Sequence, residues 1–395
     1  MASPQAGARN LRVISAANLI TGTYNNLLQV ILQPFVVTLA GSVALLGVLQ
    51  ALASRLGGVI GAIAQFAGGH LADRWGRKPV ILLGSAFNAA CLTLFLATAV
   101  TGWAPLLVPA FVFLGLGLLG SPANQSAVAE SVDARGRAMA YSKVLFFLLL
   151  PAAIMAFLGG YIADAFGYAL IFVVSLGLEA VNFGLFAAIL RETLRERNPE
   201  PWTIRATLRL REPRLRGILI MTTVDLFVWQ ISLAIIYGMA KERFGFTNAD
   251  LGIIVGVWAL TFWAATLPVG KLVERFGSRW MIFVSESLGL PIMVGWILAS
   301  TPLEFALISV LNGLTAATWV PALQTLIANL TEDRARAEAI GQITAVRSLL
   351  ASPAPLLGGF LYSTVGYAAP MAASFGGIGI ALVLILRYVH DPPRP

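Results

Sequence analysis

The feature that most constrains the fold is a series of apolar runs, each close to the length needed to cross a membrane. A spanning helix needs roughly 20 largely apolar residues, and the 395-residue chain divides into about twelve such runs joined by short turns. Only 12% of the residues are charged and 58% are hydrophobic, whereas roughly a quarter of an average soluble domain is charged. The sequence therefore predicts an all-α membrane protein with no room for a soluble domain.

The apolar runs predict twelve transmembrane helices in two sets of six. The expected ranges are 11–40, 43–69, 79–101, 104–129, 139–163 and 167–190, then 215–240, 247–270, 280–300, 303–330, 338–363 and 366–389. The segment between the two sets is charged and contains prolines, which is typical of a linker. We therefore expect an N-terminal six-helix bundle over 1–190, a cytoplasmic linker over 191–214 and a C-terminal six-helix bundle over 215–395.

The distribution of basic residues predicts the orientation in the membrane. Most of the 27 Lys and Arg residues lie at the two ends of the chain, in alternate turns and in the linker, and the opposite side holds only Lys241 and Arg243. By the positive-inside rule, both termini are expected to be cytoplasmic, in a multi-pass protein of the cytoplasmic (inner) membrane. The net charge of +8 thus indicates topology and no nucleic-acid partner, because the basic residues are divided among separate loops.

Few residues are available for covalent or metal chemistry. Cys91 is the only cysteine and lies inside an apolar run, while the only histidines, His70 and His390, lie at membrane edges. No disulfide can form within the chain, and neither a metal site, a bound cofactor nor a Cys/His nucleophile pair is expected. A membrane-embedded enzyme or a receptor is a remote alternative, so we expect no enzymatic activity. The first apolar run continues past residue 35, which fits a retained helix rather than a cleaved signal.

A short charged turn between two apolar runs carries a recognisable motif. It reads Gly68-Gly69-His70-Leu71-Ala72-Asp73-Arg74-Trp75-Gly76-Arg77-Lys78-Pro79. This turn resembles the G-x-L-A-D-R-x-G-R-K motif between the second and third helices of the major facilitator superfamily of secondary transporters. A weaker copy, Gly270 to Ser278, aligns with Gly69 to Arg77 about half a chain away. Two copies at that interval indicate an internal repeat and not a chance basic turn.

Further matches join the fourth and fifth helices to the tenth and eleventh. They pair Pro122 with Pro321, Gln125 with Gln324, Arg135 and Arg137 with Arg334 and Arg336, Leu158-Gly159-Gly160 with Leu357-Gly358-Gly359, and Gly167-Tyr168 with Gly366-Tyr367. The resemblance covers essentially the whole chain. It implies the major facilitator fold, with two pseudo-symmetric six-helix bundles and a substrate site near the bilayer midplane between them.

The same resemblance implies a conformational latch at the motif turn. In the family the motif aspartate meets the start of helix eleven, and the motif arginine engages an acid at the end of helix four, which stabilises the state closed toward the cytoplasm. The positions expected to form this latch are Gly69, Asp73, Arg74, Gly76, Arg77 and Glu130. In the second copy Ser278 replaces the arginine and Asn329 replaces the acid, so we expect the charged latch in the first half only. Residues Arg191-Glu192-Thr193-Leu194 also resemble the acidic ending after the sixth helix of many members.

Polar side chains on four helices are candidates for a substrate and proton pathway. On the first helix, Asn18, Gly22, Asn25, Asn26, Gln29 and Gln33 share one face, which either bonds neighbouring helices or lines a water-filled cavity. In the family, helices one, four, seven and ten line the cavity. The candidates on the other three are Asn124 and Gln125, Asp225 and Trp229, and Asn312 and Trp319. The two tryptophans are as consistent with packing as with substrate contact.

Away from the span ends, the ionisable residues well inside predicted spans are Arg55, Glu179, Asp225, Glu286 and Arg347. Charges inside a bilayer are costly and therefore indicate function. Asp225 lies on a cavity helix and is the candidate for proton or cation binding. Arg55 and Arg347 are further candidates for the substrate and proton pathway, with a structural ion pair or a role in helix packing as the alternative. Either arginine could pair with Asp225 and hold it ionised. Glu179 and Glu286 lie on helices outside the cavity, and for them we expect local partners.

The chain is most similar to the drug/proton antiporter branch, with two departures. The branch often has an arginine in helix four where this chain has Phe111, and the fifth-helix G-P-x-x-G-G signature survives only as Gly159-Gly160. The resemblance implies a monomeric secondary transporter that moves a small organic, amphipathic or cationic molecule by alternating access, with proton-coupled export as the main expectation. The alternative is a uniporter or proton symporter that imports a small solute such as a sugar.

Overall fold

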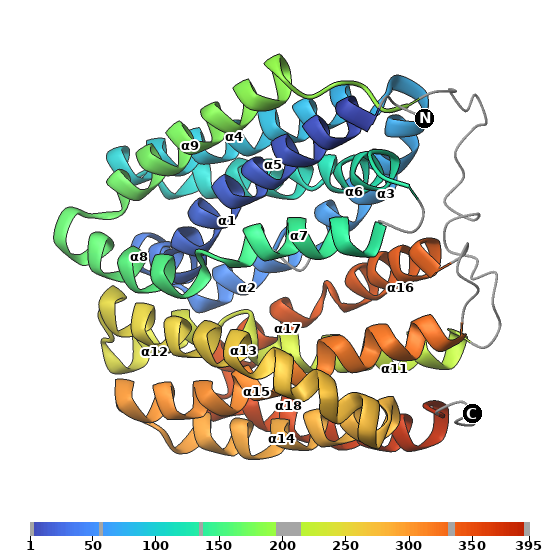
Figure 1. Ribbon diagram of the computed structural model, residues 1–395. Helices are drawn as coiled ribbons and strands as arrows, with labels where there is room; N and C mark the ends of the chain where they lie inside the picture. Colours follow the sequence, from blue (N-terminus) through green and yellow to red (C-terminus); the bar gives the residue numbers. More distant parts are fainter. Residues whose placement is uncertain (1–3, 55–57, 134–136, 195–214, 331–335, 391–395) are drawn as a thin grey trace. The chain divides into compact units, whose positions relative to one another are not determined.

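The computed structural model describes residues 4–54, 58–133, 137–194, 215–330 and 336–390. Its elements are helices (Figure 1). They are α1 (Pro4–Ala40), α2 (Val43–Leu52), α3 (Gly58–Trp75), α4 (Arg77–Thr101), the 3-10 turn η1 (Ala104–Leu106), α5 (Leu107–Gly117), α6 (Gly120–Glu130), α7 (Arg137–Leu149), α8 (Ala152–Phe166) and α9 (Tyr168–Ala188), then α11 (Leu215–Leu233), α12 (Ile236–Phe244), α13 (Asn248–Phe276), α14 (Ser278–Leu298), α15 (Pro302–Leu330), α16 (Arg336–Ala351), α17 (Ala354–Thr364) and α18 (Ala368–Tyr388).

Among the described residues, nine helical segments are long and apolar enough to cross a membrane. Helix α1, the pair α2 and α3, and the pair α16 and α17 occupy the three remaining expected spans. The predicted fold class, an all-α membrane protein with twelve spans, is therefore confirmed. Several spans that the sequence shows as single runs are broken in the structure. Pro151 and Pro353 stand at the breaks before α8 and α17, where proline lacks the N–H that a continuous helix needs.

The chain divides into two compact units, which are described separately. Unit 1 comprises Met1–Phe35 and Leu52–Ile204, and unit 2 comprises Val36–Ala51 and Arg205–Pro395. The short helix α2 thus falls with the second unit, although its sequence lies in the first half. The predicted domain boundaries stay a prediction, and most of the predicted linker, residues 195–214, lies outside the described residues.

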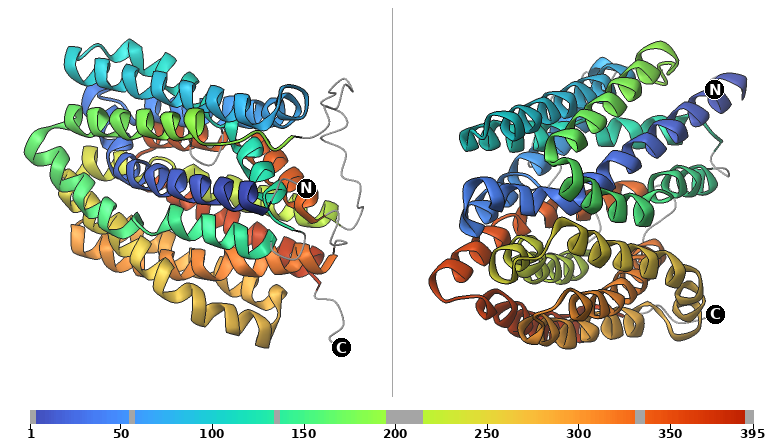
Figure 2. Two further views of the ribbon diagram at one scale, coloured as in Figure 1. Left: turned by 45° about the horizontal axis from the view of Figure 1, so that its top comes forward. Right: turned by 90° about the vertical axis from the view of Figure 1, so that its left-hand side faces the viewer.

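The internal repeat is visible in the backbone of both units. Gly76 and Gly277 precede α4 and α14 with φ of 115° and 91°, and Gly167 and Gly366 precede α9 and α18 with φ of 80° and 122°. Glycine enters this region without the steric penalty that a Cβ brings. Neighbour relations repeat as well: α4 packs against α5 and α9, and α14 packs against α15 and α18 (Figures 1 and 2).

An aromatic cluster fills the core of unit 1. The Phe95 ring packs edge-on against Phe111, with 5.6 Å between centroids, and stacks on Phe172 at 5.4 Å. Phe111 is fully buried. It stands where the antiporter branch often has an arginine, so in this chain the position stabilises the core by aromatic packing and supplies no charge.

Close packing of α17 on α11 in unit 2 gives a first prediction. A Cβ added to Gly358 would collide with the carbonyl oxygen of Ile231, whereas one added to Gly376 on α18 would meet open space. Overpacking typically costs about 1–3 kcal/mol, and about 2–4 °C in melting temperature follows each kcal/mol in a domain of this size. We expect Gly358→Ala to lower the thermal midpoint of the purified protein, and Gly376→Ala to preserve or slightly raise it, because alanine favours a helix more than glycine does. Equal midpoints for the two variants would contradict this packing.

Candidate functional site

Two buried carboxyl groups meet inside unit 2. Asp225 on α11 is 6% exposed, and Glu286 on α14 is 1% exposed. Their side chains lie within hydrogen-bonding reach of each other. Two ionised carboxylates offer four acceptor oxygens and no donor, and their like charges repel. A hydrogen bond between them therefore requires one proton, so this arrangement of side chains can bind a proton.

The surroundings of the pair determine which carboxyl accepts. Trp229, one turn after Asp225, donates its indole Nε1–H to Glu286 Oε2 at 3.2 Å. Gly289 leaves room for this ring, because a Cβ at that position would lie 2.9 Å from Trp229 Cζ2. The other oxygen, Glu286 Oε1, is buried and receives no hydrogen bond from an N–H or O–H group. A proton on Asp225 can supply that donor, which makes Glu286 the acceptor of the pair.

Arg347 on α16 adds a positive charge to this cluster. It lies close enough for its charge to act on Asp225, and its Nε is buried without a hydrogen-bond partner. Two acids and one guanidinium are neutral together when the acids hold one proton. The cluster carries one negative charge when that proton leaves. The chemistry available here is thus the exchange of a proton for another cation.

The sequence identified Asp225 and named Arg347 as a possible partner, but it did not identify Glu286 as the second carboxyl. The sequence did contain a signal for this pairing, because Asp225 and Glu286 lie at similar depths along their helices. Both acids lie between two and three helical turns from the start of their helices, at 3.6 residues per turn. The local partner expected for Glu286 proves to be Trp229 together with Asp225.

A second charged cluster lies at the motif turn of unit 1. Arg77, the first residue of α4, pairs through Nη1 with Asp73 Oδ1 at 2.5 Å and through Nη2 with Glu130 Oε1 at 3.0 Å. The Arg77 side chain is 10% exposed, and those of Asp73 and Glu130 are 47% and 30% exposed. Arg74 is exposed and contributes to neither ion pair. Gly69 lies in ordinary contact distance of Pro122.

The acidic ending after α9 completes this cluster. Glu192 Oε1 accepts from the backbone N–H of Arg77 at 2.9 Å, and Oε2 accepts from that of Lys78 at 3.1 Å. Thr193 Oγ1 donates to Glu130 Oε2 at 2.5 Å. Glu192 therefore caps the start of α4, where N–H groups lack partners and the helix dipole favours an anion. The requirement for Gly76 also follows, because a Cβ there would lie 2.5 Å from Glu192 Oε2.

Removing this cap should destabilise unit 1. We expect Glu192→Ala to lower the thermal midpoint by the equivalent of about 0.5–2 kcal/mol, the usual effect of losing a helix cap. Glu192→Gln keeps one acceptor oxygen, so its thermal midpoint should lie between those of Glu192→Ala and the native protein. Circular dichroism of the purified proteins during heating measures both midpoints. A Glu192→Ala protein that melts with the native protein would show that the cap contributes nothing.

The surroundings of the remaining candidates differ from one residue to the next. On α1, the side-chain amides of Asn18 and Asn26 bond their own helix, at the carbonyls of Ile14 and Gly22, 2.8 and 2.7 Å away. The other described candidates are Asn25 and Gln29, partly buried; Gln33, buried; Asn124, whose Oδ1 is buried without a partner; Gln125, exposed; Asn312, buried; and Trp319, which packs against the core. Arg55 lies outside the described residues. The pathway role of this set stays a prediction.

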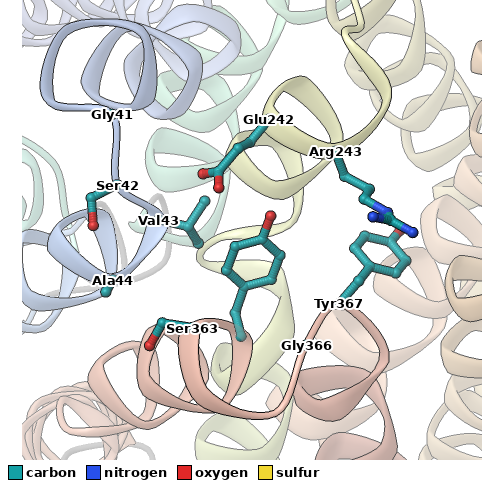
Figure 3. Close-up of a pocket in the computed structure, with 10 residues that line it drawn as sticks. Gly41, Ser42, Val43, Ala44, Glu242, Arg243, Ser363, Gly366 and Tyr367 are labelled. Atoms are coloured by element: carbon teal, nitrogen blue, oxygen red, sulfur yellow. The ribbon is translucent and has the colours of Figure 1, made fainter.

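An open pocket of about 600 Å³ lies elsewhere in unit 2. It is lined by Gly41, Ser42, Val43, Ala44, Glu242, Arg243, Tyr362, Ser363, Gly366 and Tyr367. Figure 3 shows the Glu242 carboxylate directed into the pocket and Arg243 beside Tyr367. None of the residues proposed from the sequence for substrate or proton binding lines it.

Helices of bilayer length with ionisable side chains buried inside them indicate an integral membrane protein with a functional site within the membrane. The family model of the Major Facilitator Superfamily matches residues 14–224 and 218–395. The chain therefore belongs to the Major Facilitator Superfamily, as the motif turn and the repeat predicted.

Curated relatives include two bacterial proteins named multidrug resistance protein MdtG. That of Salmonella arizonae is 26% identical over 328 residues, and that of Salmonella typhi is 26% identical over 323 residues. Each match covers 80% of this chain and 79% of the relative. These matches confirm that the chain resembles the drug/proton antiporter branch of the superfamily.

Solved structures show the same fold at low sequence identity. The human organic anion transporter MFSD10 is 16% identical, with a TM-score of 0.70, and the match covers 96% of this chain and 99% of that one. A bacterial homologue of the human lysosomal transporter Spinster is 15% identical, with a TM-score of 0.71 and coverage of 97% and 95%. These similarities concern the fold alone.

Proposed function

We propose that the protein is a secondary active transporter that exports small organic, amphipathic or cationic molecules across the cytoplasmic membrane in exchange for protons. The observation that carries this proposal is the buried pair of Asp225 and Glu286, which forms its hydrogen bond only when it holds one proton. Membership of a transporter superfamily supports transport. The names of the curated relatives support export of drug-like molecules.

The proposed coupling is a competition between a proton and a cationic substrate. With the proton bound, Asp225, Glu286 and Arg347 are neutral together, which suits a low-dielectric surrounding. When the proton leaves Asp225, the cluster carries one negative charge. A cationic substrate can then be attracted to the carboxylates, and rebinding of a proton releases it. Since the two ligands cannot both be held well, alternating access converts inward proton flow into outward substrate flow.

The rest of the proposal takes over the expectations drawn from the sequence. The protein acts as a monomer without a bound cofactor and with both termini in the cytoplasm, and it performs no enzymatic reaction. The latch of Asp73, Arg77 and Glu130 stabilises the state closed toward the cytoplasm. On this basis, Asp73→Asn should favour the state open to the cytoplasm, because Arg77 would lose one of its two carboxylate partners.

Transport in proteoliposomes tests the proposed function. Purified protein is reconstituted, ethidium is the probe, and its movement is recorded with and without an imposed pH gradient at clamped zero membrane potential. We expect ethidium to accumulate against its gradient only when protons flow the opposite way. If ethidium only equilibrates across the membrane, with or without the pH gradient, proton coupling is excluded. Gradient-driven uptake of a sugar in the direction of proton flow would favour the import alternative.

A further inference from the structure

A third buried carboxyl group lies in unit 1, far along the chain from the pair described above. Glu179 is at the middle of α9 and is 1% exposed. Within the described part of the chain, no charged side chain lies among the groups that act on it. An ionised carboxylate inside a bilayer without a cation is costly, so the neighbours of Glu179 determine whether it carries a charge or a proton.

The neighbours of Glu179 come from three helices and are all neutral. Ser85 of α4 donates its hydroxyl to Glu179 Oε1. Asn182, one turn further along α9, donates its amide to Glu179 Oε2 at 3.4 Å and also to Thr21 Oγ1 of α1 at 3.1 Å. The hydroxyl of Tyr24 on α1 completes the set of donors. Helix α8 also packs against α9, but its described residues contribute no group to this cage.

The cage can satisfy both protonation states of the carboxyl. The ionised form accepts from Ser85, Tyr24 and Asn182. A protonated form needs an acceptor, and two buried oxygens on the same face of α9 have no partner: Asn182 Oδ1 and Ser175 Oγ. The Ser85 hydroxyl can also reverse its role, because it both donates and accepts. A glutamine would be sufficient for a purely structural hydrogen bond, whereas only an acid can bind and release a proton.

The two acidic sites involve corresponding positions of the internal sequence repeat. When the alignment of Gly69 with Gly270 is continued, Ser85 of α4 aligns with Glu286 of α14. In unit 2 the repeated helix supplies the acid itself, and in unit 1 it supplies the hydroxyl that bonds the acid. In each unit another helix adds two side chains about one turn apart: α11 adds Asp225 and Trp229 in unit 2, and α1 adds Thr21 and Tyr24 in unit 1.

We propose that Glu179, in its cage of Ser85, Asn182 and Tyr24, is a second proton-binding site of this transporter. Its use in transport rests on the proposed function, in which case one transport cycle moves two protons, one bound in each unit. The binding of a proton by Glu179 does not depend on which molecule is transported. The two parts can therefore be tested separately.

Infrared difference spectroscopy tests proton binding directly. The purified, reconstituted protein is titrated with pH, and the carbonyl stretch of protonated carboxyl groups is recorded. We expect Glu179→Gln to lose one pH-dependent band, Glu179→Asp to restore a band, and Asp133→Asn, a change at an exposed acid of the same unit, to leave that band intact. Spectra of Glu179→Gln that match the native protein at every pH would overturn the proposal, as would a Glu179 band that never responds to pH.

The steady ethidium gradient at a fixed pH gradient tests the number of protons. Each coupled proton multiplies the limiting concentration ratio by about tenfold for every pH unit. We expect the native protein to reach about a hundredfold at one pH unit and Glu179→Gln to reach about tenfold less, with Asp133→Asn unchanged. A native ratio near tenfold that Glu179→Gln preserves would overturn the transport role of Glu179. If the ethidium concentration ratio reached by the native protein does not change with the pH gradient, the proposed function is refuted. The infrared experiment would still decide whether Glu179 binds a proton.

Discussion

Asp225→Asn is expected to abolish the accumulation of ethidium driven by a pH gradient and to weaken ethidium binding, while leaving downhill exchange measurable. Asparagine has almost the shape of aspartate, and it can still donate a hydrogen bond to Glu286, but it cannot release a proton. The cluster with Arg347 would then be locked in its neutral form. Proteoliposome uptake with and without the pH gradient measures coupling, and quenching of intrinsic fluorescence by ethidium measures binding.

Matched variants separate coupling from folding in this experiment. Glu286→Gln should also lose gradient-driven accumulation, because Asp225 then has no anionic partner for its proton. Glu242→Gln, at an exposed acid of the same unit, should behave like the native protein. Trp229→Phe removes the indole donor to Glu286 but no titratable group, so coupling should persist with an altered pH dependence. A well-folded Asp225→Asn protein with native gradient-driven transport would exclude Asp225 from the mechanism.

Arg77→Gln is expected to give the largest loss of stability among changes at the motif turn. Arg77 is the most buried member of its cluster and bonds two carboxylates. Its removal leaves Asp73 and Glu130 close together without their shared cation. Hydrogen bonds to charged groups contribute about 1.5–3 kcal/mol, and we expect a total loss in that range because solvent screens the exposed Asp73. The thermal midpoint should fall by about 2–4 °C for each kcal/mol.

The order of the variants tests the geometry of the cluster. Glu130→Gln should be less harmful than Arg77→Gln but more harmful than Asp73→Asn, because Glu130 also accepts from Thr193 and is less exposed than Asp73. Arg74→Gln changes a neighbouring arginine of the same motif that is exposed and outside both ion pairs, so its midpoint should equal that of the native protein. If Arg74→Gln and Arg77→Gln destabilise the protein equally, the buried position of Arg77 has no energetic importance.

Much of the fold could be predicted because its causes are local in the chain. The length of each apolar run is determined by bilayer thickness, so the spans are visible in the sequence. Glycines at positive φ also leave a local signal, and Gly76 and Gly277 occupy aligned positions of the repeat. The breaks inside spans were less visible. Pro353 disrupts its run by a local effect, but α2 and α3 are separate helices although no proline stands in residues 43–69.

The candidate sites were only partly predictable, because a contact joins residues that are distant in sequence. The pairing of Arg77 with Glu130 came from family resemblance and is present. The cap that Glu192 provides for α4 depends on where the chain after α9 passes the start of α4, and no local pattern gives that position. The same holds for Ser85 and Glu179, which meet because α4 and α9 pack side by side.

By itself, therefore, the sequence determined the membrane class, the number of spans, the repeat and the presence of acids inside the bilayer, since hydrophobic length, glycine conformation and the cost of buried charge act residue by residue. Only the tertiary structure decided the partners of those acids. Glu286 faces Asp225, and Glu179 faces three neutral donors, because the rotation and register of packed helices determine which faces meet. Those two properties arise from the sum of many side-chain contacts and are not encoded at any single position.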